Sequence, residues 1–483
     1  MERIQGRNFI AGQWMEAADG ARHDARSPID CSALGWIAWS KRADVRVAIA
    51  AAREAGPGWR RTPVWERAAI CRRIADAIEK CRAVLVDVIV NEQGKPTAEA
   101  EFEVGKAADG FRLAADLVRF LEGRTIPTED PRKVVMTFHQ PRGVYGIITP
   151  WNFPMNIPVE YLAPGIASGN AIVWNAAPTT SLCAVGLMAA IADADLPPGV
   201  CNLVLGEGPE VGDEIVTNPG TDAIGFTGSA ATGQTIARRG AGKPMLLEMG
   251  GNGPVIVFDD ADLDAAAAAT ASGCFFNAGQ VCSSSERILV QRSALDAFAA
   301  RMVEEARKIV LGDPRKAETT MGPLNNGKVA AKVREHVDDA VTRGASVAFG
   351  GGPGSGFPSD LYFQPTVLTG VTRDSLINIE ETFGPVAPLI VFDDEAEALR
   401  LAVDNRYGLV SSVFTSDLGR AFRMIDELPT GIVNVNDTSN YWELHIPFGG
   451  MAGRDSGIGR LGGRDTLLAM CDVKTATITR GQA

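Results

Sequence analysis

The chain of 483 residues contains few of the residues that build metal centres. It has four histidines, which are widely scattered, and eight cysteines, none of which forms a CxxC pair. Such a pattern does not supply the ligand cluster of a zinc site. A chain of this length can also bury a large core without covalent cross-links. We therefore predict that there is no metal site and that the cysteines are reduced thiols, most of them in the core.

Long apolar runs and positive charge are also lacking. No run of 18 apolar residues occurs, and residues 1–14, MERIQGRNFIAGQW, contain no apolar core of a signal peptide. The net charge is −12, whereas nucleic acids and anionic membranes bind basic surfaces. These absences predict a cytoplasmic protein that binds neither nucleic acid nor membrane. The length suggests two or three domains, at roughly 100–200 residues each.

From Gly143 onward, short β-branched runs alternate with helical stretches, which predicts parallel sheets covered by helices. The alternation forms two blocks, 143–250 and 251–436, so we predict an α/β fold with two doubly wound domains. The first 130 residues instead combine a short hairpin at NFIAGQW with helical patterns. The stretches RKVVMTFHQPRG and VKTATITR are isolated strands, which we expect to pair with each other or with another subunit.

Two strand–glycine–helix junctions in the first block favour phosphate binding. In FTGSAATG a strand ends at Phe226, Gly228 allows close backbone approach, and Ser229 precedes a helix N-terminus that favours an anion. The second junction, GEGPEVG, contains Gly208 and Gly212. Neither has the G-x-G-x-x-G spacing, and a simply capped helix explains either one alone equally well. Together they suggest a dinucleotide crevice at the strand ends.

Three polar residues are candidates for catalysis. Cys282, in FFNAGQVCSSSERILV, lies in a polar, small-residue stretch, as expected of an accessible nucleophilic thiol. Glu248 ends an apolar strand, where burial would raise its pKa and suit a general base. Asn152, in TPWNFP, follows a strand end and is placed to donate to an oxyanion. Each also has a structural interpretation: an inert packing thiol, a strand-end ion pair and an Asx turn, respectively.

The motifs PWNFP, FTGS, LEMGG, GQVCSSSERILV, EETFGPV and PFGG…SGIGR resemble, in order and approximate spacing, those of the NAD(P)-dependent aldehyde dehydrogenases. The resemblance covers nearly the whole chain. It implies that Cys282 attacks the aldehyde, while Asn152 and the Cys282 N–H stabilise the oxyanion. The thiohemiacetal then gives hydride to the nicotinamide, and water activated by Glu248 hydrolyses the thioester to the acid. The presence of Glu248 argues against the CoA-acylating branch of the family.

The resemblance also implies a cofactor site. The FTGS turn would lie against the pyrophosphate, and Glu381 and Phe383 of EETFGPV would hold the nicotinamide ribose and ring. The expected cofactor-binding residues are Thr149, Pro150, Trp151, Asn175, Pro178, Gly208, Gly212, Phe226, Gly228, Ser229, Met249, Gly250, Glu381 and Phe383.

One cofactor motif departs from the family pattern. The family usually holds the adenosine ribose with a lysine and a glutamate, whereas GNAIVWNAAPTTS has Asn175 and Pro178 at these places. Loss of the glutamate removes a barrier to the 2′-phosphate of NADP, and loss of the lysine removes an attraction. We predict NAD or NADP as cofactor, with NAD slightly preferred.

The expected substrate-binding residues are Phe153, Glu160, Ser283, Tyr441, Trp442 and Phe448. Members that act on succinic semialdehyde carry an arginine at the place of Glu160. Because a carboxylate there would repel an acidic substrate, we expect a neutral, aromatic or cationic aldehyde. The C-terminal motif also has two more residues between PFGG and SG than the family pattern leads us to expect.

The resemblance divides the chain into four parts. Their expected ranges are 1–130 with 143–250 for the cofactor-binding domain, 251–436 for the catalytic domain, 437–464 for a substrate and anchor loop, and 131–142 with 465–483 for the oligomerisation strands of a homodimer or homotetramer. Two other functions stay open: a cofactor-independent thiol hydrolase that uses Cys282 and Glu248, and a catalytically retired member with a structural or binding role.

Overall fold

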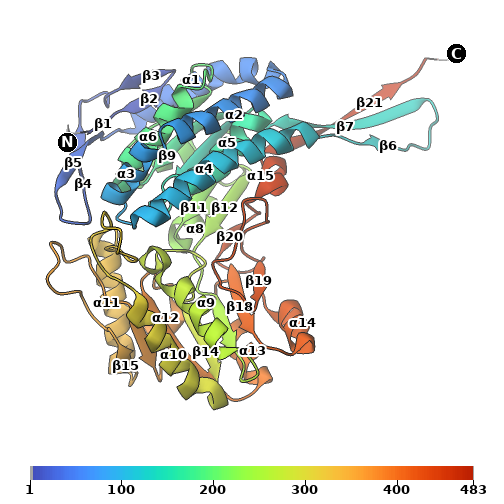
Figure 1. Ribbon diagram of the computed structural model, residues 1–483. Helices are drawn as coiled ribbons and strands as arrows, with labels where there is room; N and C mark the ends of the chain where they lie inside the picture. Colours follow the sequence, from blue (N-terminus) through green and yellow to red (C-terminus); the bar gives the residue numbers. More distant parts are fainter. Residues whose placement is uncertain (1–3, 482–483) are drawn as a thin grey trace.

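The computed structural model describes residues 4–481 and contains two large sheets, one above the other in Figure 1. The strands of the first are β2 (Asn8–Ile10), β3 (Gln13–Met15), β8 (Val144–Thr149), β9 (Ala171–Ala176), β10 (Cys201–Leu203), β11 (Ala223–Gly228), β12 (Met245–Met249) and β20 (Gly457–Ile458). Their order is β20-β12-β11-β8-β9-β10-β2-β3. The run from β12 to β10 is parallel, whereas β20 and the β2–β3 hairpin are antiparallel. The predicted hairpin at NFIAGQW is thus confirmed.

Helices cover both faces of this sheet. They are α1 (Arg42–Arg61), α2 (Val64–Lys80), α3 (Arg82–Glu92), α4 (Thr97–Leu117), α5 (Asn156–Ser168), α6 (Ser181–Ala192), α7 (Asp213–Thr217) and α8 (Ala230–Arg239). Strand β9 shows why two layers are needed, because its side chains alternate between two apolar cores. Ile172 and Trp174 pack with α5 and α6, whereas Ala171 and Val173 pack with α1.

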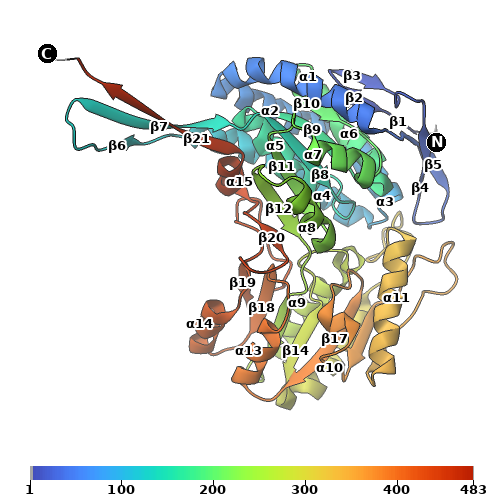
Figure 2. The same cartoon turned by 180° about the vertical axis from the view of Figure 1, so that it is seen from behind.

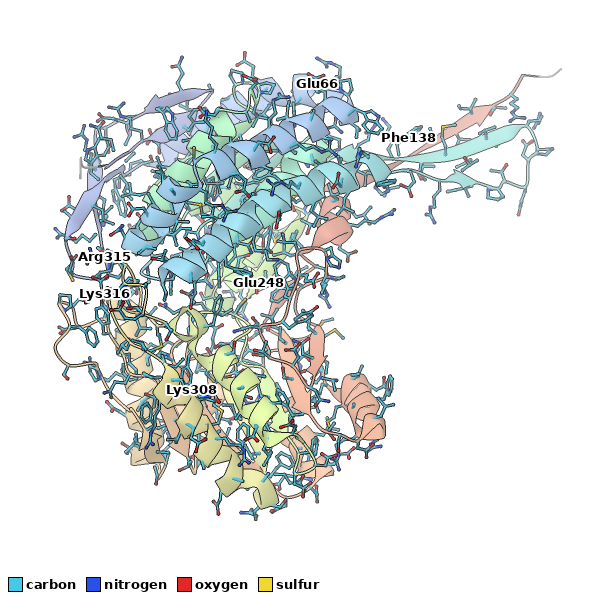
Figure 3. The ribbon with its side chains drawn as sticks, viewed as in Figure 1. Glu66, Phe138, Glu248, Lys308, Arg315 and Lys316 are labelled. Atoms are coloured by element: carbon cyan, nitrogen blue, oxygen red, sulfur yellow. The ribbon has the colours of Figure 1, made fainter. Side chains whose placement is uncertain are left out.

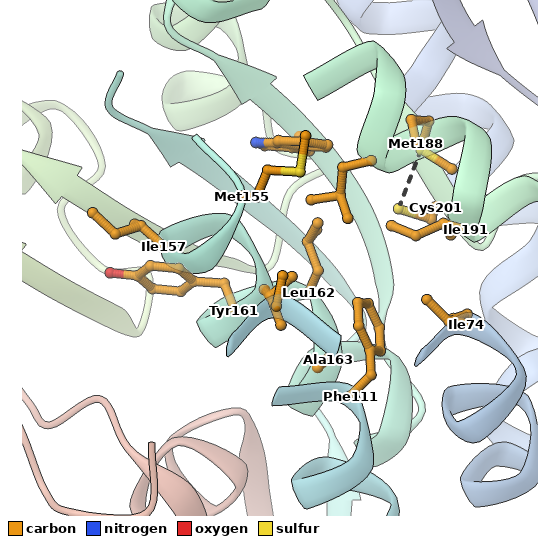
Figure 4. Close-up of a cluster of buried hydrophobic side chains, with 14 of the residues drawn as sticks. Ile74, Phe111, Met155, Ile157, Tyr161, Leu162, Ala163, Met188, Ile191 and Cys201 are labelled. Atoms are coloured by element: carbon orange, nitrogen blue, oxygen red, sulfur yellow. Dashed lines mark hydrogen bonds between the residues drawn. The ribbon is translucent and has the colours of Figure 1, made fainter. Parts of the chain in front are cut away.

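Helix α5 is the central element of the first core. Tyr161, Leu162 and Ala163 are completely buried, and Figure 4 shows them in one apolar cluster with Phe111 of α4. The Cys201 thiol lies 3.9 Å from the Met188 sulfur in the same core. All eight cysteines are free thiols, and five of them are buried.

The second large sheet has the strands β13 (Pro254–Val257), β14 (Arg287–Gln291), β15 (Ser346–Phe349), β16 (Thr366–Thr369), β17 (Val386–Phe392), β18 (Val410–Phe414) and β19 (Ile432–Val435). Their order is β15-β16-β17-β14-β13-β18-β19, and only β15 is antiparallel. Its helices are α9 (Leu263–Phe275), α10 (Leu295–Lys308), α11 (Gly327–Thr342), α12 (Leu376–Ile379), α13 (Glu395–Val403) and α14 (Leu418–Glu427). This sheet has its own apolar core.

An arm of three strands projects from the body, as Figure 2 shows from behind. It consists of β6 (Thr125–Ile126), β7 (Lys133–Pro141) and β21 (Cys471–Thr479), and β7 and β21 pair along their whole length. The expectation that these two strands pair with each other is confirmed. The range 465–483 is not all strand, because α15 (Gly463–Ala469) precedes β21 and packs on the body.

A second three-stranded sheet lies near the start of the chain. It contains β1 (Ile4–Gly6), β4 (Arg22–Arg26) and β5 (Ala33–Ala38), in the order β1-β5-β4. Among the described residues, no helix is both long and apolar enough to span a bilayer.

Candidate active site

Cys282 lies in a tightly turned loop between α9 and β14. Three of the residues that precede Cys282 have positive φ angles: Asn277 (50°), Ala278 (54°) and Gly279 (72°). A Cβ at Gly279 would lie 2.1 Å from the carbonyl oxygen of Gly384, so only glycine fits there. Such a loop turns the chain sharply and leaves Cys282 half-buried, unlike the fully buried Cys274 on α9.

Two cavities meet at this thiol. The smaller has a volume of about 140 Å³ and the larger about 580 Å³. Cys282, Glu248 and Thr227 line both of them. The larger cavity lies at the carboxyl ends of β8, β9, β11 and β12, the edge where open α/β sheets bind ligands.

Glu248, the fourth residue of β12, lies at the junction between the two large sheets (Figure 3). Its side chain is buried, and Oε1 has no hydrogen-bond partner among the described residues. Burial raises the pKa of Glu248 well above its usual range, although a hydrogen bond from the Cys282 thiol opposes the rise. Burial and the Glu248 carboxylate likewise raise the pKa of the Cys282 thiol. The surroundings of the two groups therefore favour the neutral form of each.

Asn152 lies in the loop between β8 and α5 and is also buried. Its Nδ2 donates to the carbonyl oxygen of Gln280 at 3.0 Å, which uses one of the two amide hydrogens. The other hydrogen remains available. The backbone N–H of Cys282 is not engaged by any acceptor in residues 4–481. These two donors are the pair that an oxyanion beside Cys282 would need.

A buried ion pair holds the Asn152 loop. Lys95 Nζ donates to Glu103 Oε2 at 2.5 Å and to the carbonyl oxygen of Asn152 at 3.0 Å, and neither charged side chain is exposed. Glu103 Oε1 accepts hydrogen bonds from the backbone N–H groups of Met155 and Asn156, at 2.8 and 3.2 Å. The ammonium also lies 4.0 Å from the centre of the Phe153 ring. Sequence reasoning missed this pair, because charges in GKPTAEAEFE look like an ordinary solvated helix start.

Most of the expected cofactor-binding residues line the larger cavity. They are Thr149, Pro150, Trp151, Asn175, Pro178, Gly208, Phe226, Gly228, Ser229, Gly250, Glu381 and Phe383. Gly212 lines an adjoining cavity of about 700 Å³ that Gly208 also borders. Met249 lines neither; its side chain is buried in an apolar cluster and packs against Gly233 of α8.

The ends of the larger cavity have different chemistry. Glu381 Oε1 accepts the N–H of Gly251 at 2.9 Å, and burial raises the pKa of Glu381 to about 7. Phe383 has a positive φ of 60° and meets the edge of Trp151. At the start of α8, Ser229 Oγ accepts a hydrogen bond from the backbone N–H of Thr232. Ser229 is therefore the N-cap residue of this helix, which is the structural interpretation that the sequence left open.

The shape and polarity of this cavity fit a dinucleotide. A Cβ at Gly250 would lie 2.6 Å from the Glu381 carboxylate, so the glycine keeps this passage open. Asn175 has a buried side chain whose Oδ1 accepts no hydrogen bond from a described residue. Such open acceptors and glycine-lined backbone are what ribose hydroxyls and phosphates require.

Five of the six expected substrate-binding residues line the smaller cavity: Phe153, Glu160, Ser283, Trp442 and Phe448. Tyr441 does not, because it is 46% exposed and its hydroxyl donates to Glu443. Burial raises the pKa of Glu160 to about 8, and its Oε1 accepts a hydrogen bond from Asn156 Nδ2 at 2.8 Å.

Sequence reasoning missed several residues of this cavity. They are Phe102, Glu103, Lys106, Asn156, Ile157, Thr227, Phe276, Val281, Asn440 and Leu461. Lys106 is half-buried and forms no ion pair with a described residue. The helical spacing of Phe102, Glu103 and Lys106 is the signal that could have placed them on one face of α4.

Comparison with known proteins identifies the family. The model of the aldehyde dehydrogenase family matches residues 14–476. A glutarate-semialdehyde dehydrogenase of Pseudomonas putida is 36% identical over 473 residues, which cover 98% of this chain and 97% of the relative. An NADP-dependent succinate-semialdehyde dehydrogenase of Escherichia coli is 37% identical over 468 residues, or 96% of each chain.

Solved structures agree with this assignment. The crystal structure of an NADP-dependent enzyme of Escherichia coli has a TM-score of 0.96, 36% identity and 98% coverage of both chains. A betaine aldehyde dehydrogenase of Staphylococcus aureus in complex with NAD+ has a TM-score of 0.95, with 33% identity and coverage of 99% of this chain and 95% of that one. The predicted fold class is confirmed. The chain belongs to the aldehyde dehydrogenase family, as its motifs predicted, and is an oxidoreductase that converts an aldehyde to the acid with NAD or NADP.

Proposed function

We propose that Cys282 is the nucleophile, Glu248 the general base and Asn152 the oxyanion donor of this dehydrogenase. The observation that carries the proposal is that Cys282 and Glu248 line both cavities. The smaller cavity would admit the aldehyde and the larger would hold the dinucleotide. The thiol would thus reach both reactants without moving.

The chemistry follows from the position of Cys282 and Glu248 on the walls of the same two cavities. Glu248 takes the thiol proton, the Cys282 sulfur bonds to the aldehyde carbon, and the carbonyl electrons move to oxygen. The Asn152 Nδ2–H and the Cys282 N–H stabilise this oxyanion. When bound, a nicotinamide cofactor would supply the acceptor for the hydride that the carbon loses as the carbonyl re-forms. Glu248, having released its first proton to solvent, then takes a proton from a water that attacks the thioester, and the acid leaves as the sulfur departs.

The cofactor residues divide along the larger cavity. Asn175, Pro178 and Gly208 would lie along the adenosine ribose, and Gly228 and Ser229 would lie against the pyrophosphate. Glu381 and Phe383 would hold the nicotinamide ribose and ring. We propose NAD as the preferred cofactor, because no lysine stands at position 175 to attract a 2′-phosphate.

The domains have separate parts in this proposal. The first sheet, from residues 1–130 and 143–250, holds the cofactor, and the range 251–436 supplies Cys282. The loop 437–464 contributes Trp442 and Phe448 and returns to the first sheet at β20. The arm would join subunits of a homo-oligomer, since its strands expose Phe138, Val473 and Ile478. The cytoplasmic location stays a prediction from the sequence.

Five aromatic rings favour a neutral or aromatic aldehyde as substrate: Phe102, Phe153, Phe276, Trp442 and Phe448. With a pKa of about 8, Glu160 is protonated at neutral pH. The repulsion of an acidic aldehyde that the sequence suggested therefore acts mainly above that pH. Rapid turnover of succinic semialdehyde, at a rate equal to that of an uncharged aldehyde of the same length, would contradict this substrate class.

A variant series tests the catalytic roles. Cys282→Ala should abolish formation of the reduced cofactor from any aldehyde while NAD binding, measured by titration calorimetry, is kept. A Cys274→Ala variant is the matched control, because that cysteine is buried away from both cavities. Aldehyde oxidation by Cys282→Ala would refute the assignment. Ester hydrolysis without cofactor, in the absence of aldehyde oxidation, would favour the thiol hydrolase instead.

A further inference from the structure

Glu286 is a buried carboxyl group that has no part in the proposed function. It follows Cys282 by four residues and directly precedes β14, and its side chain lines neither of the two cavities that meet at the thiol. Its partners among the described residues are two backbone groups. Oε2 accepts the N–H of Thr382 and Oε1 accepts the N–H of Phe383, both at 2.6 Å. Because the residue is only 2% exposed, these two hydrogen bonds fix the carboxyl group.

The Thr382–Phe383 turn that Glu286 holds has an unusual backbone. Phe383 has a φ of 60°, in the left-handed region that a bulky residue rarely adopts. Such a conformation persists only where the surrounding structure over-determines it. The Thr382 hydroxyl lies 3.0 Å from Nδ1 of the buried His336, and the Phe383 ring meets the edge of Trp151. Glu286 binds the backbone of the turn itself and thereby holds the strained residue in place.

Glu286 also links this turn to the nucleophile. Strands β14 and β17 are adjacent and parallel, and residues 282–286 lead into β14 as residues 380–385 lead into β17. The two segments therefore lie at the same edge of the sheet. Cys282 on the first segment and Phe383 on the second both line the larger cavity. Because the Glu286 side chain joins the two segments by hydrogen bonds, it fixes the position of the turn relative to the sulfur.

We propose that Glu286 is a positioning residue for hydride transfer, because it holds the Thr382–Phe383 turn in a set position relative to Cys282. The inference rests on the proposed function, in which the reacting carbon is bound to Cys282 and Phe383 holds the nicotinamide ring. Glu286 touches neither reactant and acts through the turn. The rate of transfer depends steeply on the relative position of the two carbons, whereas dinucleotide binding depends on the whole larger cavity. Loss of Glu286 should therefore slow the transfer more than it weakens binding.

Glu286→Gln tests this inference, because it keeps the size of the side chain but places an NH2 group against one of the two N–H donors. We would measure formation of reduced cofactor in a single turnover, with enzyme in excess over an uncharged aldehyde. The rate should fall by about 10- to 100-fold, as expected for a displacement of about 1 Å. Deuterium on the aldehyde carbon should slow the residual reaction further, and the Kd for NAD from titration calorimetry should stay close to that of the wild type. A normal rate at saturating NAD, with or without weaker binding, would overturn the inference.

Glu92→Gln is the matched control. Glu92 is also buried, and its Oε1 and Oε2 accept the backbone N–H groups of Leu182 and Cys183 at 2.9 and 2.8 Å, but it lines neither cavity. Both variants should lose stability in denaturant unfolding, because each places a donor against a buried N–H group. Only Glu286→Gln should lose the single-turnover rate. An equal loss of rate in Glu92→Gln would reduce the effect to one of general stability and overturn the inference.

Alkylation of the thiol separates the turn from the nucleophile. Iodoacetamide should modify Cys282 in Glu286→Gln at the wild-type rate, measured by mass spectrometry of the peptide that contains it. Alkylation slowed by the same factor as the single turnover would overturn the inference, because the thiol itself would then be altered. Undiminished aldehyde oxidation by wild-type protein alkylated at Cys282 would instead overturn the proposed function. If Glu286→Gln does not fold, Glu286→Asp keeps a carboxylate that is one methylene shorter, and a normal single-turnover rate in that variant would overturn the inference.

Discussion

The Lys95–Glu103 ion pair gives a prediction that separates positioning from stability. In Lys95→Met, the Glu103 carboxylate remains buried with the two backbone N–H groups but without its cation. Removing one partner of a buried pair costs about 3–5 kcal/mol of unfolding free energy. Denaturant unfolding of the variant should show a loss of this order. A Lys95→Met/Glu103→Leu double variant should recover part of it, because the Glu103 carboxylate is then no longer buried without its cation.

The effect on the rate has a different origin. The Asn152 carbonyl loses one of its two side-chain donors, Lys95 Nζ, and keeps the other, Asn277 Nδ2 at 3.0 Å. Loss of a whole oxyanion donor costs about 10²–10³ in kcat, so loosening one of its anchors should cost less, about tenfold. The KM for cofactor should stay unchanged. Unlike stability, kcat should not recover in the double variant with Glu103→Leu, because the Asn152 carbonyl still lacks its donor.

A double-mutant cycle tests whether Lys95 acts on catalysis through Asn152. If Lys95 acts on catalysis only through Asn152, then Lys95→Met should cause no further loss of kcat in an Asn152→Ala background. Multiplicative losses would mean that Lys95 affects the reaction by another route. A single Lys95→Met variant with reduced stability but normal kcat would make the pair purely structural.

Three further predictions follow from the site and the arm. Glu248→Gln should slow both the formation of the thioester and its hydrolysis, so rapid mixing should show no fast burst of reduced cofactor; a burst at the wild-type rate would contradict the role of Glu248 in forming the thiolate. The pKa of Glu160 is about 8 in the folded protein and about 4.3 in the unfolded chain. The contribution of this carboxyl group to stability is therefore complete below about pH 4.3 and is lost as the pH rises to 8. The slope is up to about 1.4 kcal/mol of unfolding free energy per pH unit. In denaturant unfolding measured between about pH 5 and 8, the slope for Glu160→Gln should be smaller than that of the wild type by up to about 1.4 kcal/mol per pH unit, and an unchanged slope would contradict the shift. Val473→Asp, on the exposed face of β21, should shift the assembly toward monomers in light scattering, whereas Thr475→Ser on the same strand should not.

The sequence predicted the parts of the fold and site that depend on local pattern. Alternating strands and helices were enough for two parallel sheets, and short motifs were enough to bring Cys282, Glu248 and Asn152 together. The alternation of side chains along a strand could also have placed Met249 in the apolar core. Successive side chains of a strand face opposite sides, so the neighbour of a cavity-facing Glu248 must face the core. Lys95 and Glu103 were not predictable in this way, because their burial depends on how α4 packs against the Asn152 loop.

The residues that line the smaller cavity were harder to predict from the sequence for the same reason. Trp442 and Tyr441 are neighbours in an irregular loop with no strand or helix period, and only Trp442 turns inward. Its indole N–H donates to the carbonyl oxygen of Ile446 at 3.1 Å, which fixes the ring, whereas the Tyr441 hydroxyl finds Glu443 at the surface. Composition alone does not distinguish two aromatic residues whose polar atoms find partners on opposite sides of a loop.

The raised pKa values also explain why one carboxylate can serve two steps. Burial and the Glu248 carboxylate both raise the pKa of the Cys282 thiol, so the sulfur keeps its proton in the resting site. In the proposed mechanism, the thiolate forms as Glu248 accepts this proton. Once the sulfur is acylated it has no proton to give, so Glu248 loses its thiol donor, and Oε1 already lacks a partner among the described residues. In the proposed mechanism, a water that enters this position would take the place of the thiol as proton donor, and Glu248 would then activate the water as it activated the sulfur.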